Sequence, residues 1–171
     1  MSFRHALLTL AFATAMSPAL AQDHHTAPAL AAHGEAVTIG TIEITGAFTR
    51  ATLPNAPVAG GFLTLTNKGS EDDRLVSAEA DIARDTQIHE MAMDGDIMKM
   101  RQITDGLVIP AGESVTLSPG GYHLMMMGLN APVAEGDAIP VTLTFEKAGS
   151  IVVELLAGGT AADAPGQPMG H

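Results

Sequence analysis

The sequence predicts an all-β fold, a sandwich or a barrel built as a single domain. Apolar and β-branched residues gather in short segments, and turn-forming residues such as Pro119-Gly120-Gly121 separate them. No stretch carries a helical apolar stripe longer than two turns. Short strands at this spacing are typical of sandwiches and barrels. The expected strands are residues 37–39, 42–44, 61–66, 74–78, 86–93, 97–103, 114–117, 141–145 and 151–155.

The two ends of the chain differ from this central part. The N-terminus combines a basic start, an apolar run from Ala6 to Met16 and the small-x-small pattern Ala19-Leu20-Ala21, which is typical of a secretory signal peptide. The apolar run is too short to cross a bilayer, so we expect a periplasmic protein without a membrane span. The expected parts are a signal peptide at 1–21, a flexible His-containing tail at 22–35, a folded domain at 36–156 and a flexible tail at 157–171.

Charge and cysteine usage exclude some classes of protein. The formal net charge is −11, which disfavours nucleic acids and anionic membrane surfaces as partners. The sequence has no cysteine, so it has neither a disulfide framework nor the thiolate that a blue-copper electron-transfer centre needs. It also offers no cysteine as a lipid acceptor, and we expect a soluble monomer.

Methionine and histidine gather in two short segments of the predicted strands. Seven of the ten methionines lie between residues 91 and 127. Thioether sulfur is a soft ligand and imidazole a borderline one, so the combination favours Cu(I) over hard cations. The two segments read His89-Glu90-Met91-Ala92-Met93-Asp94-Gly95-Asp96-Ile97-Met98-Lys99-Met100 and Gly120-Gly121-Tyr122-His123-Leu124-Met125-Met126-Met127.

The first segment predicts a hairpin with a type I′ turn centred on Asp94-Gly95. That register pairs His89 with Met100, Met91 with Met98 and, on the opposite face, Glu90 with Lys99. In the second segment His123 and Met125 share one face by the same alternation. If the two segments meet, the predicted Cu(I) ligands are His89, Met100, His123 and Met125, with Met91 and Met98 as auxiliary ligands.

Simpler readings of these residues remain open. Methionine often fills irregular space in a core, and a histidine in a strand is usually a satisfied polar residue. The alternatives are therefore a zinc-binding exported protein using His89, Glu90 and His123, or a metal-free structural or interaction sandwich. No enzyme is expected, because the sequence shows no HExxH motif, phosphate-binding loop or supported catalytic triad.

The two segments resemble the periplasmic copper chaperones of the PCuAC type. His89 and Met100 have ten residues between them, as in the pattern of that family, and His123-Leu124-Met125 matches its final His-x-Met. Twenty-two residues separate Met100 from His123, one more than in the family, and we expect the surplus in the turn Thr104-Asp105-Gly106. The resemblance covers roughly residues 37–155, including Phe48-Thr49-Arg50, Gly60-Gly61-Phe62, Asn67 and Asp73-Arg74-Leu75-Val76.

The resemblance implies a cupredoxin-like Greek-key β-sandwich that carries Cu(I). It implies delivery to a copper-accepting protein, such as a cytochrome c oxidase subunit or another copper chaperone.

A second, Cu(II) site is expected at the N-terminal tail, because cleavage after Ala21 leaves a free amine with His24 at the third position. Square-planar nitrogen coordination of that kind suits Cu(II).

Overall fold

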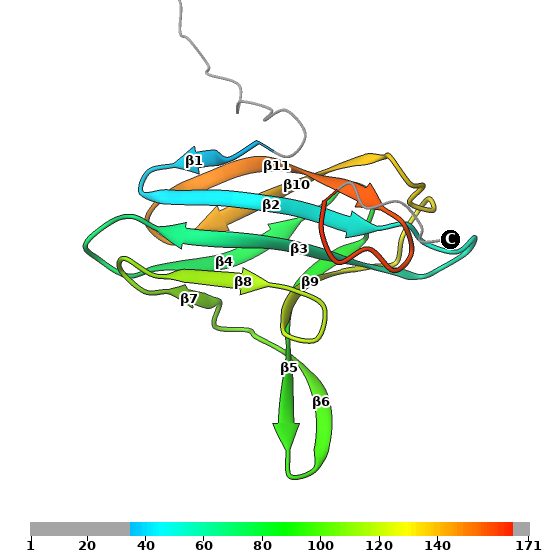
Figure 1. Ribbon diagram of the computed structural model, residues 1–171, viewed down its shortest axis with the longest axis horizontal. Coiled ribbons are helices and arrows are strands. Elements are labelled where there is room, and N and C mark those ends of the chain that lie inside the picture. The colour runs from blue at the N-terminus through cyan, green and yellow to red at the C-terminus, as the bar shows by residue number, and fades with distance from the viewer. Residues whose placement is uncertain (1–34, 166–171) are drawn as a thin grey trace, which may run out of the picture.

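Residues 35–165 of this computed structural model can be described, and they form an eleven-stranded sheet without a helix (Figure 1). The predicted signal peptide and nearly all of the predicted N-terminal tail lie outside these residues. The strands are β1 (Val37–Ile39), β2 (Ile42–Arg50), β3 (Val58–Asn67), β4 (Asp73–Glu79), β5 (Asp85–Asp94), β6 (Ile97–Gln102), β7 (Leu107–Ile109), β8 (Ser114–Leu117), β9 (Tyr122–Met127), β10 (Ala138–Phe145) and β11 (Gly149–Gly158).

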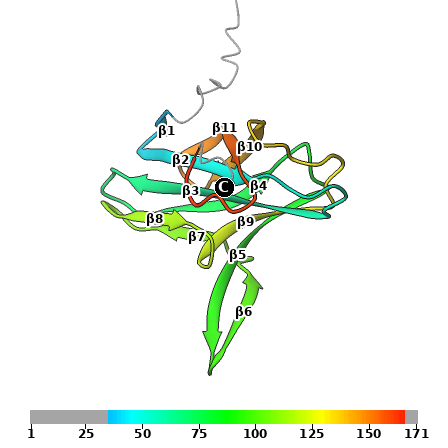
Figure 2. The same ribbon diagram turned by 45° about the vertical axis from the view of Figure 1, so that its right-hand side comes forward.

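The sheet folds back on itself around one core, so the predicted all-β sandwich is confirmed. Its hydrogen-bonded order is β6-β5-β9-β8-β3-β2-β11-β10-β4-β7, with β1 added beside β2 and an extra pairing of β9 with β3. Most neighbours are antiparallel, whereas β11 runs parallel to β2 and β8 runs parallel to β9. The wrapped arrangement of β2, β3, β10 and β11 is visible in Figures 1 and 2.

Alternation of side chains explains how these strands build the core. In β10 every second residue is buried, and β11, its antiparallel partner, shows the same pattern. Side chains with period two lie on one face of a sheet, so each strand contributes one apolar row. The buried rows of these two strands are Ile139, Val141, Leu143 and Phe145, and Ile151, Val153, Leu155 and Ala157.

Strands β5 and β9 use the same alternation to separate the core from the candidate site. Ile88, Leu124 and Met126 belong to the hydrophobic core. The residues that alternate with them along each strand point to the other face of the sheet. His89, which follows Ile88, and His123, which precedes Leu124, are among these residues. The core contacts on one face therefore fix the position of the histidines on the other.

The β5–β6 hairpin projects away from the body of the sandwich (Figures 1 and 2). The predicted register of this hairpin is wrong by two residues. Asp94 pairs with Ile97, so the two-residue loop is Gly95-Asp96, and Gly95 alone has a positive φ, of 65°. A positive φ at the first loop position is the type II′ geometry, which avoids the left-handed backbone that a type I′ turn would require of Asp94.

The corrected register changes partners but keeps the faces. His89 faces Gln102 instead of Met100, and Met91 faces Met100 instead of Met98. A shift of two residues leaves every side chain on its original face, because the pleat has a period of two. Glu90 pairs with Arg101 at 2.7 Å, and Lys99 pairs with Asp94.

The predicted C-terminal tail begins too early at residue 157. Strand β11 continues to Gly158, with Ala157 opposite Thr49 and Gly158 opposite Arg50 of β2. Beyond the strand Ala162 is buried, and its carbonyl accepts a hydrogen bond of 2.7 Å from Nε of Arg50. Residues 157–165 therefore pack against the domain.

We predict that this segment contributes measurably to stability. A chain ending at Leu156 should lose at least about 2 kcal/mol of unfolding free energy relative to a chain ending at Pro165, because it loses buried side chains and strand pairing. Urea unfolding of the two chains checks this, since both lack residues 166–171. Equal midpoints would contradict the packed segment.

Candidate metal centre

The centre is built on two histidines that face each other across neighbouring strands. His89 of β5 lies directly opposite His123 of β9, and both side chains are only 8% exposed. Their ring centroids are 5.7 Å apart with an angle of 64° between the planes. Two imidazoles held edge to face at this distance can present nitrogen lone pairs to one ion between them.

A chain of hydrogen bonds along β5 fixes the tautomer of His89. Gln87 receives a hydrogen bond from Nε2 of His89 at 2.8 Å, and its own amide NH₂ donates to Asp85 at 2.6 Å. Nε2 of the neutral ring therefore carries the hydrogen, and Nδ1 carries the lone pair. Nδ1 is buried without a hydrogen-bond partner, which is the state expected of a nitrogen reserved for a metal.

A backbone carbonyl fixes the tautomer of His123. Nδ1 of His123 lies 3.1 Å from the carbonyl oxygen of Gly121, which can only accept, so Nδ1 is the donor. Nε2 of His123 then carries the lone pair. The two histidines therefore offer different nitrogens, Nδ1 of His89 and Nε2 of His123, from opposite strands.

Burial holds His89 in the form that can bind a metal. Desolvation lowers the pKa of His89 below its ordinary value, the nearby His123 lowers it further, and the Asp85 carboxylate opposes these effects. A lowered pKa means that the neutral ring persists to lower pH. Because only neutral imidazole ligates metals, the site is prepared for binding near neutral pH.

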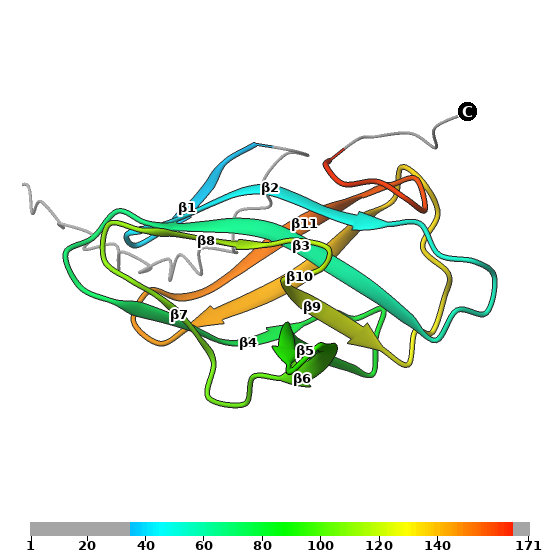
Figure 3. The same cartoon turned by 60° about the horizontal axis from the view of Figure 1, so that its bottom comes forward.

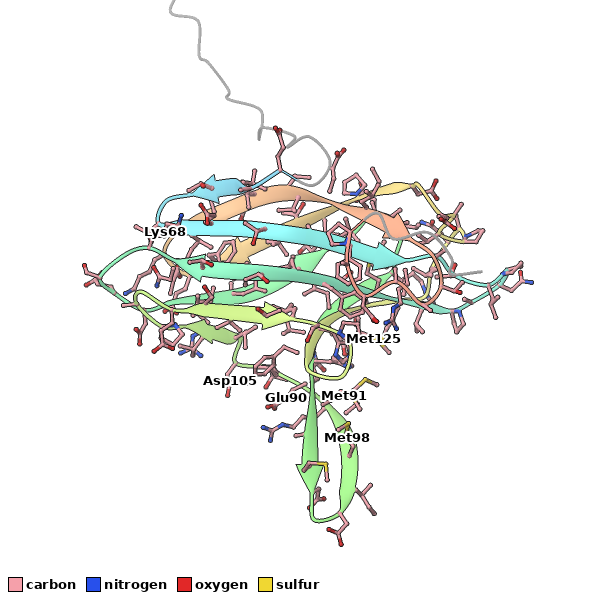
Figure 4. The ribbon with its side chains drawn as sticks, viewed as in Figure 1. Lys68, Glu90, Met91, Met98, Asp105 and Met125 are labelled. Carbon is pink, nitrogen blue, oxygen red and sulfur yellow. The ribbon has the colours of Figure 1, made fainter. Side chains whose placement is uncertain are left out.

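The predicted methionine ligands lie on either side of the histidine pair. On β9 Met125 lies one step from His123, opposite Gln87 of β5 and Gly60 of β3. In the other direction Met91 and Met100 face each other across β5 and β6. Figure 4 shows Met125, Met91 and Met98 in this sequence from the body toward the hairpin tip. All the predicted ligands of the core site thus come to one face, although Met100 lies diagonal to His89.

Aromatic side chains border the site on the β3 side. Phe62 follows Gly60 by two residues on the face that Met125 shares. The rings of Phe48 and Phe62 are 4.9 Å apart, and the guanidinium of Arg50 lies 5.7 Å from the centre of the Phe62 ring. Gly60 has to lack a side chain, because a Cβ there would come within 2.8 Å of the Phe62 ring. The packed residues 157–165 therefore support this wall through Arg50.

One predicted site residue among the described ones stands apart from the centre. Glu90 lies on the opposite face from His89 and is paired with Arg101, so it does not join the two histidines as a zinc ligand. Within residues 35–165 no three His, Cys, Asp or Glu side chains are placed to hold one metal ion. His24, the predicted Cu(II) ligand, lies outside the described residues.

Sequence reasoning missed Asp85 and Gln87. Both lie on the same strand face as His89, four and two residues before it respectively, so the alternation Asp85-x-Gln87-x-His89 carried the signal. It was overlooked because neither residue is a soft ligand. Their contribution is to orient the imidazole, as outer hydrogen-bond partners do at metal sites.

The fold of this chain is shared with PCuAC domains of known structure. The chain is similar to the apo PCuAC domain of PmoF2, with a TM-score of 0.63 and 25% identity over 75% of this chain and 98% of that one. It is similar to the copper-bound PCuAC domain from PmoF2, with a TM-score of 0.61 and 25% identity over 72% and 97% of the two chains. It is also similar to CuI-DR1885 from Deinococcus radiodurans, with a TM-score of 0.58 and 26% identity over 75% and 83%. The resemblance to PCuAC domains seen in the sequence is confirmed.

The family follows from the sequence comparison. Residues 42–157 match the family described as "Putative lipoprotein LpqE-like", and the chain belongs to this LpqE-like family. It is 38% identical over 88 residues to the putative lipoprotein Lxx21020 of Leifsonia xyli subsp. xyli (strain CTCB07). That match covers 52% of this chain and 53% of the relative, so the chain spans about half the length of the curated relative.

The lowered pKa of His89 predicts how the metal-free protein responds to acid. The unfolded chain binds a proton at this residue near pH 6.5, before the folded chain does, so folding stability falls as pH drops below about 6.5. The loss proceeds at up to about 1.4 kcal/mol per pH unit until the folded state is also protonated. Urea unfolding between pH 7.5 and pH 5 measures it.

The variant His89→Gln isolates this contribution from other titrating groups. Gln is neutral throughout, so the variant should lose less stability on acidification than the unmodified protein. Parallel stability curves for the two proteins would show that His89 titrates alike in the folded and unfolded states.

Proposed function

We propose that this protein is an exported Cu(I) carrier that binds one ion through His89, Met100, His123 and Met125. The observation that carries the proposal is the buried pair of histidines, each with one ring nitrogen held by a hydrogen bond and the other left with its lone pair. Thioethers lie on both sides of this pair on the same face. Two structural neighbours, the PCuAC domain from PmoF2 and DR1885, are known in copper-bound form, which supports the same conclusion.

The donor set explains why the cargo would be Cu(I). Two imidazoles and two thioethers are neutral, and softness favours Cu(I) over Mg²⁺ or Ca²⁺. Among residues 35–165 the carboxylates do not gather with the histidines as Zn²⁺ ligands. A neutral, thiolate-free site would release Cu(I) to an acceptor that offers thiolates, which is the behaviour of a carrier. The proposed role is that of a metal carrier and includes no catalytic step.

The acceptor and the compartment belong to the same proposal. A secretory signal at residues 1–21 directs the chain to the periplasm, where a copper-accepting protein such as a cytochrome c oxidase subunit or another copper chaperone would take the ion. Across residues 35–165 the chain forms no helix of the length and apolarity that a bilayer crossing needs.

The register predicts unequal effects of removing the two thioethers. Met125→Leu should weaken Cu(I) binding by at least about tenfold, because the cross-strand partners of Met125 are Gln87 and Gly60, neither of which carries a thioether. Met100→Leu should weaken it less, because Met91 lies directly opposite and can take its place. The double variant Met91→Leu/Met100→Leu should match Met125→Leu. Competition titration with a Cu(I) chelator measures all three.

Met126→Leu is the matched control for these variants. Met126 is 0% exposed in the core, on the opposite face from Met125, and Leu is close to Met in volume. It should bind Cu(I) like the unmodified protein. Retention of full affinity by Met125→Leu and by the double variant would refute the ligand assignment.

Proton competition gives a second test of the proposal. Cu(I) affinity should fall as pH drops from about 7 to about 5, because protonated imidazole cannot ligate and an unperturbed histidine titrates near 6.5. The lowered pKa of His89 moves its share of the loss to the acidic end of this range. The slope should not exceed two protons per ion. An affinity constant across this range would exclude the histidines as ligands.

A further inference from the structure

The projecting β5–β6 hairpin has two chemically distinct faces. One face carries the ion pairs of Glu90 with Arg101 and of Asp94 with Lys99. The other, which we call the methionine face, consists of the cross-strand pairs Met91–Met100 and Met93–Met98. The core site uses at most the pair nearest the body, so the pair at the tip is unexplained by the proposed function.

Packing does not account for the methionine face. Met93 is 62% exposed and Met98 is 53% exposed, whereas Met126 of the core is 0% exposed. The β5–β9 pairing ends at Glu90 and Tyr122, followed by one hydrogen bond of 3.2 Å from the amide of Met91 to the carbonyl of Gly121. Among residues 35–165, the strand pairings of the hairpin beyond Met91 are those between β5 and β6. Exposing large apolar side chains on such a ribbon gains no burial energy, so the choice of residue points to the sulfur atoms.

The register places the thioethers at a regular spacing. Directly opposed side chains have Cβ atoms about 4.5–5.5 Å apart, so Met93 and Met98 can both reach one ion. Successive pairs on one face lie two residues apart, or about 7 Å along the strand. The tip pair, the middle pair Met91–Met100 and the histidines therefore form three steps on one face. Figure 4 shows Met91 and Met98 along the hairpin, and Figure 3 views the β5–β6 hairpin foreshortened.

We propose that Met93 and Met98 form a second, weaker Cu(I) site at the hairpin tip, from which the ion passes along the methionine face to the core site. This inference rests on the proposed function for its destination, whereas the tip site itself does not. Passage of the ion along the methionine face requires two thioethers at each step and no residue from another chain.

The passage involves ligand exchange alone. A thioether of the middle pair forms a bond to Cu(I) as a thioether of the tip pair leaves. The imidazole lone pairs then displace Met91, whereas Met100 stays bound as a ligand of the core site. The copper remains Cu(I), and thioethers carry no proton, so neither electrons nor protons are transferred. Imidazole nitrogen is a stronger donor than thioether sulfur, which sets the direction toward the body.

Silver(I), which does not undergo redox chemistry here, is the probe for the experiment. The full-length exported protein with ¹³C-labelled methionine methyl groups is titrated and followed by NMR. The first equivalent should shift the methyl signal of Met125, and the second should shift those of Met93 and Met98 with an affinity at least about tenfold weaker. The double variant Met93→Leu/Met98→Leu should lose the second event and load its core site more slowly from a Cu(I)-chelate donor.

Ile97→Leu is the matched control, because Ile97 is equally exposed at the tip but lies on the opposite face. Ile97→Leu should behave like the unmodified protein. Thermal unfolding of this control and of the double variant tests whether both are folded. A second equivalent that leaves the Met93 and Met98 signals in place, or an unchanged stoichiometry in the double variant, would overturn the tip site. Failure of the proposed function is read separately, from an unshifted Met125 signal.

Discussion

The antiparallel pairing of β5 with β9 is the constraint on which the candidate metal centre depends. It sets His89 opposite His123, and it also sets Ile88 and Leu124 into the core on the reverse face. A slip of one residue would exchange the two faces, burying the imidazoles among aliphatic side chains and exposing the aliphatic side chains in their place. The strand pairing that stabilises the core therefore also fixes the geometry of the two histidines. The histidines need no separate loop to hold them in place.

The centre combines a rigid part with an adaptable part. The imidazoles are held by the hydrogen bonds that they donate to the carbonyl oxygens of Gln87 and Gly121, and they have lost most of their contact with water. The thioethers sit on unbranched side chains that rearrange at little cost. Fixed nitrogen ligands supply selectivity for geometry, and mobile sulfur ligands allow the coordination shell to change one ligand at a time. This division suits a protein that has to hold an ion and also give it up.

Alternation and turn signals were enough to predict the all-β fold and the face on which the histidines and methionines meet. They were not enough for the hairpin register, because Gly95 can occupy either position of a two-residue loop. Charge pairing could not decide it, since Glu90 finds a cation at Lys99 in one register and at Arg101 in the other. The boundary at residue 157 failed for another reason: Ala157 and Ala162 are too small to signal burial, and only their tertiary partners reveal it.

The parallel pairing of β11 with β2 has a consequence for the kinetics of folding. Residues 48–50 acquire their partners in β11 only when residues 156–158 are available, near the C-terminal end of the domain. Such contacts close a large loop, and their entropic cost is met before the pairing rewards it. A chain synthesised from the N-terminus onward can form local hairpins such as β5–β6 early. It cannot pair β11 with β2 until nearly the whole domain has been synthesised. Strand β2 then waits with an open edge, which is the interval in which a newly made molecule is most exposed to aggregation.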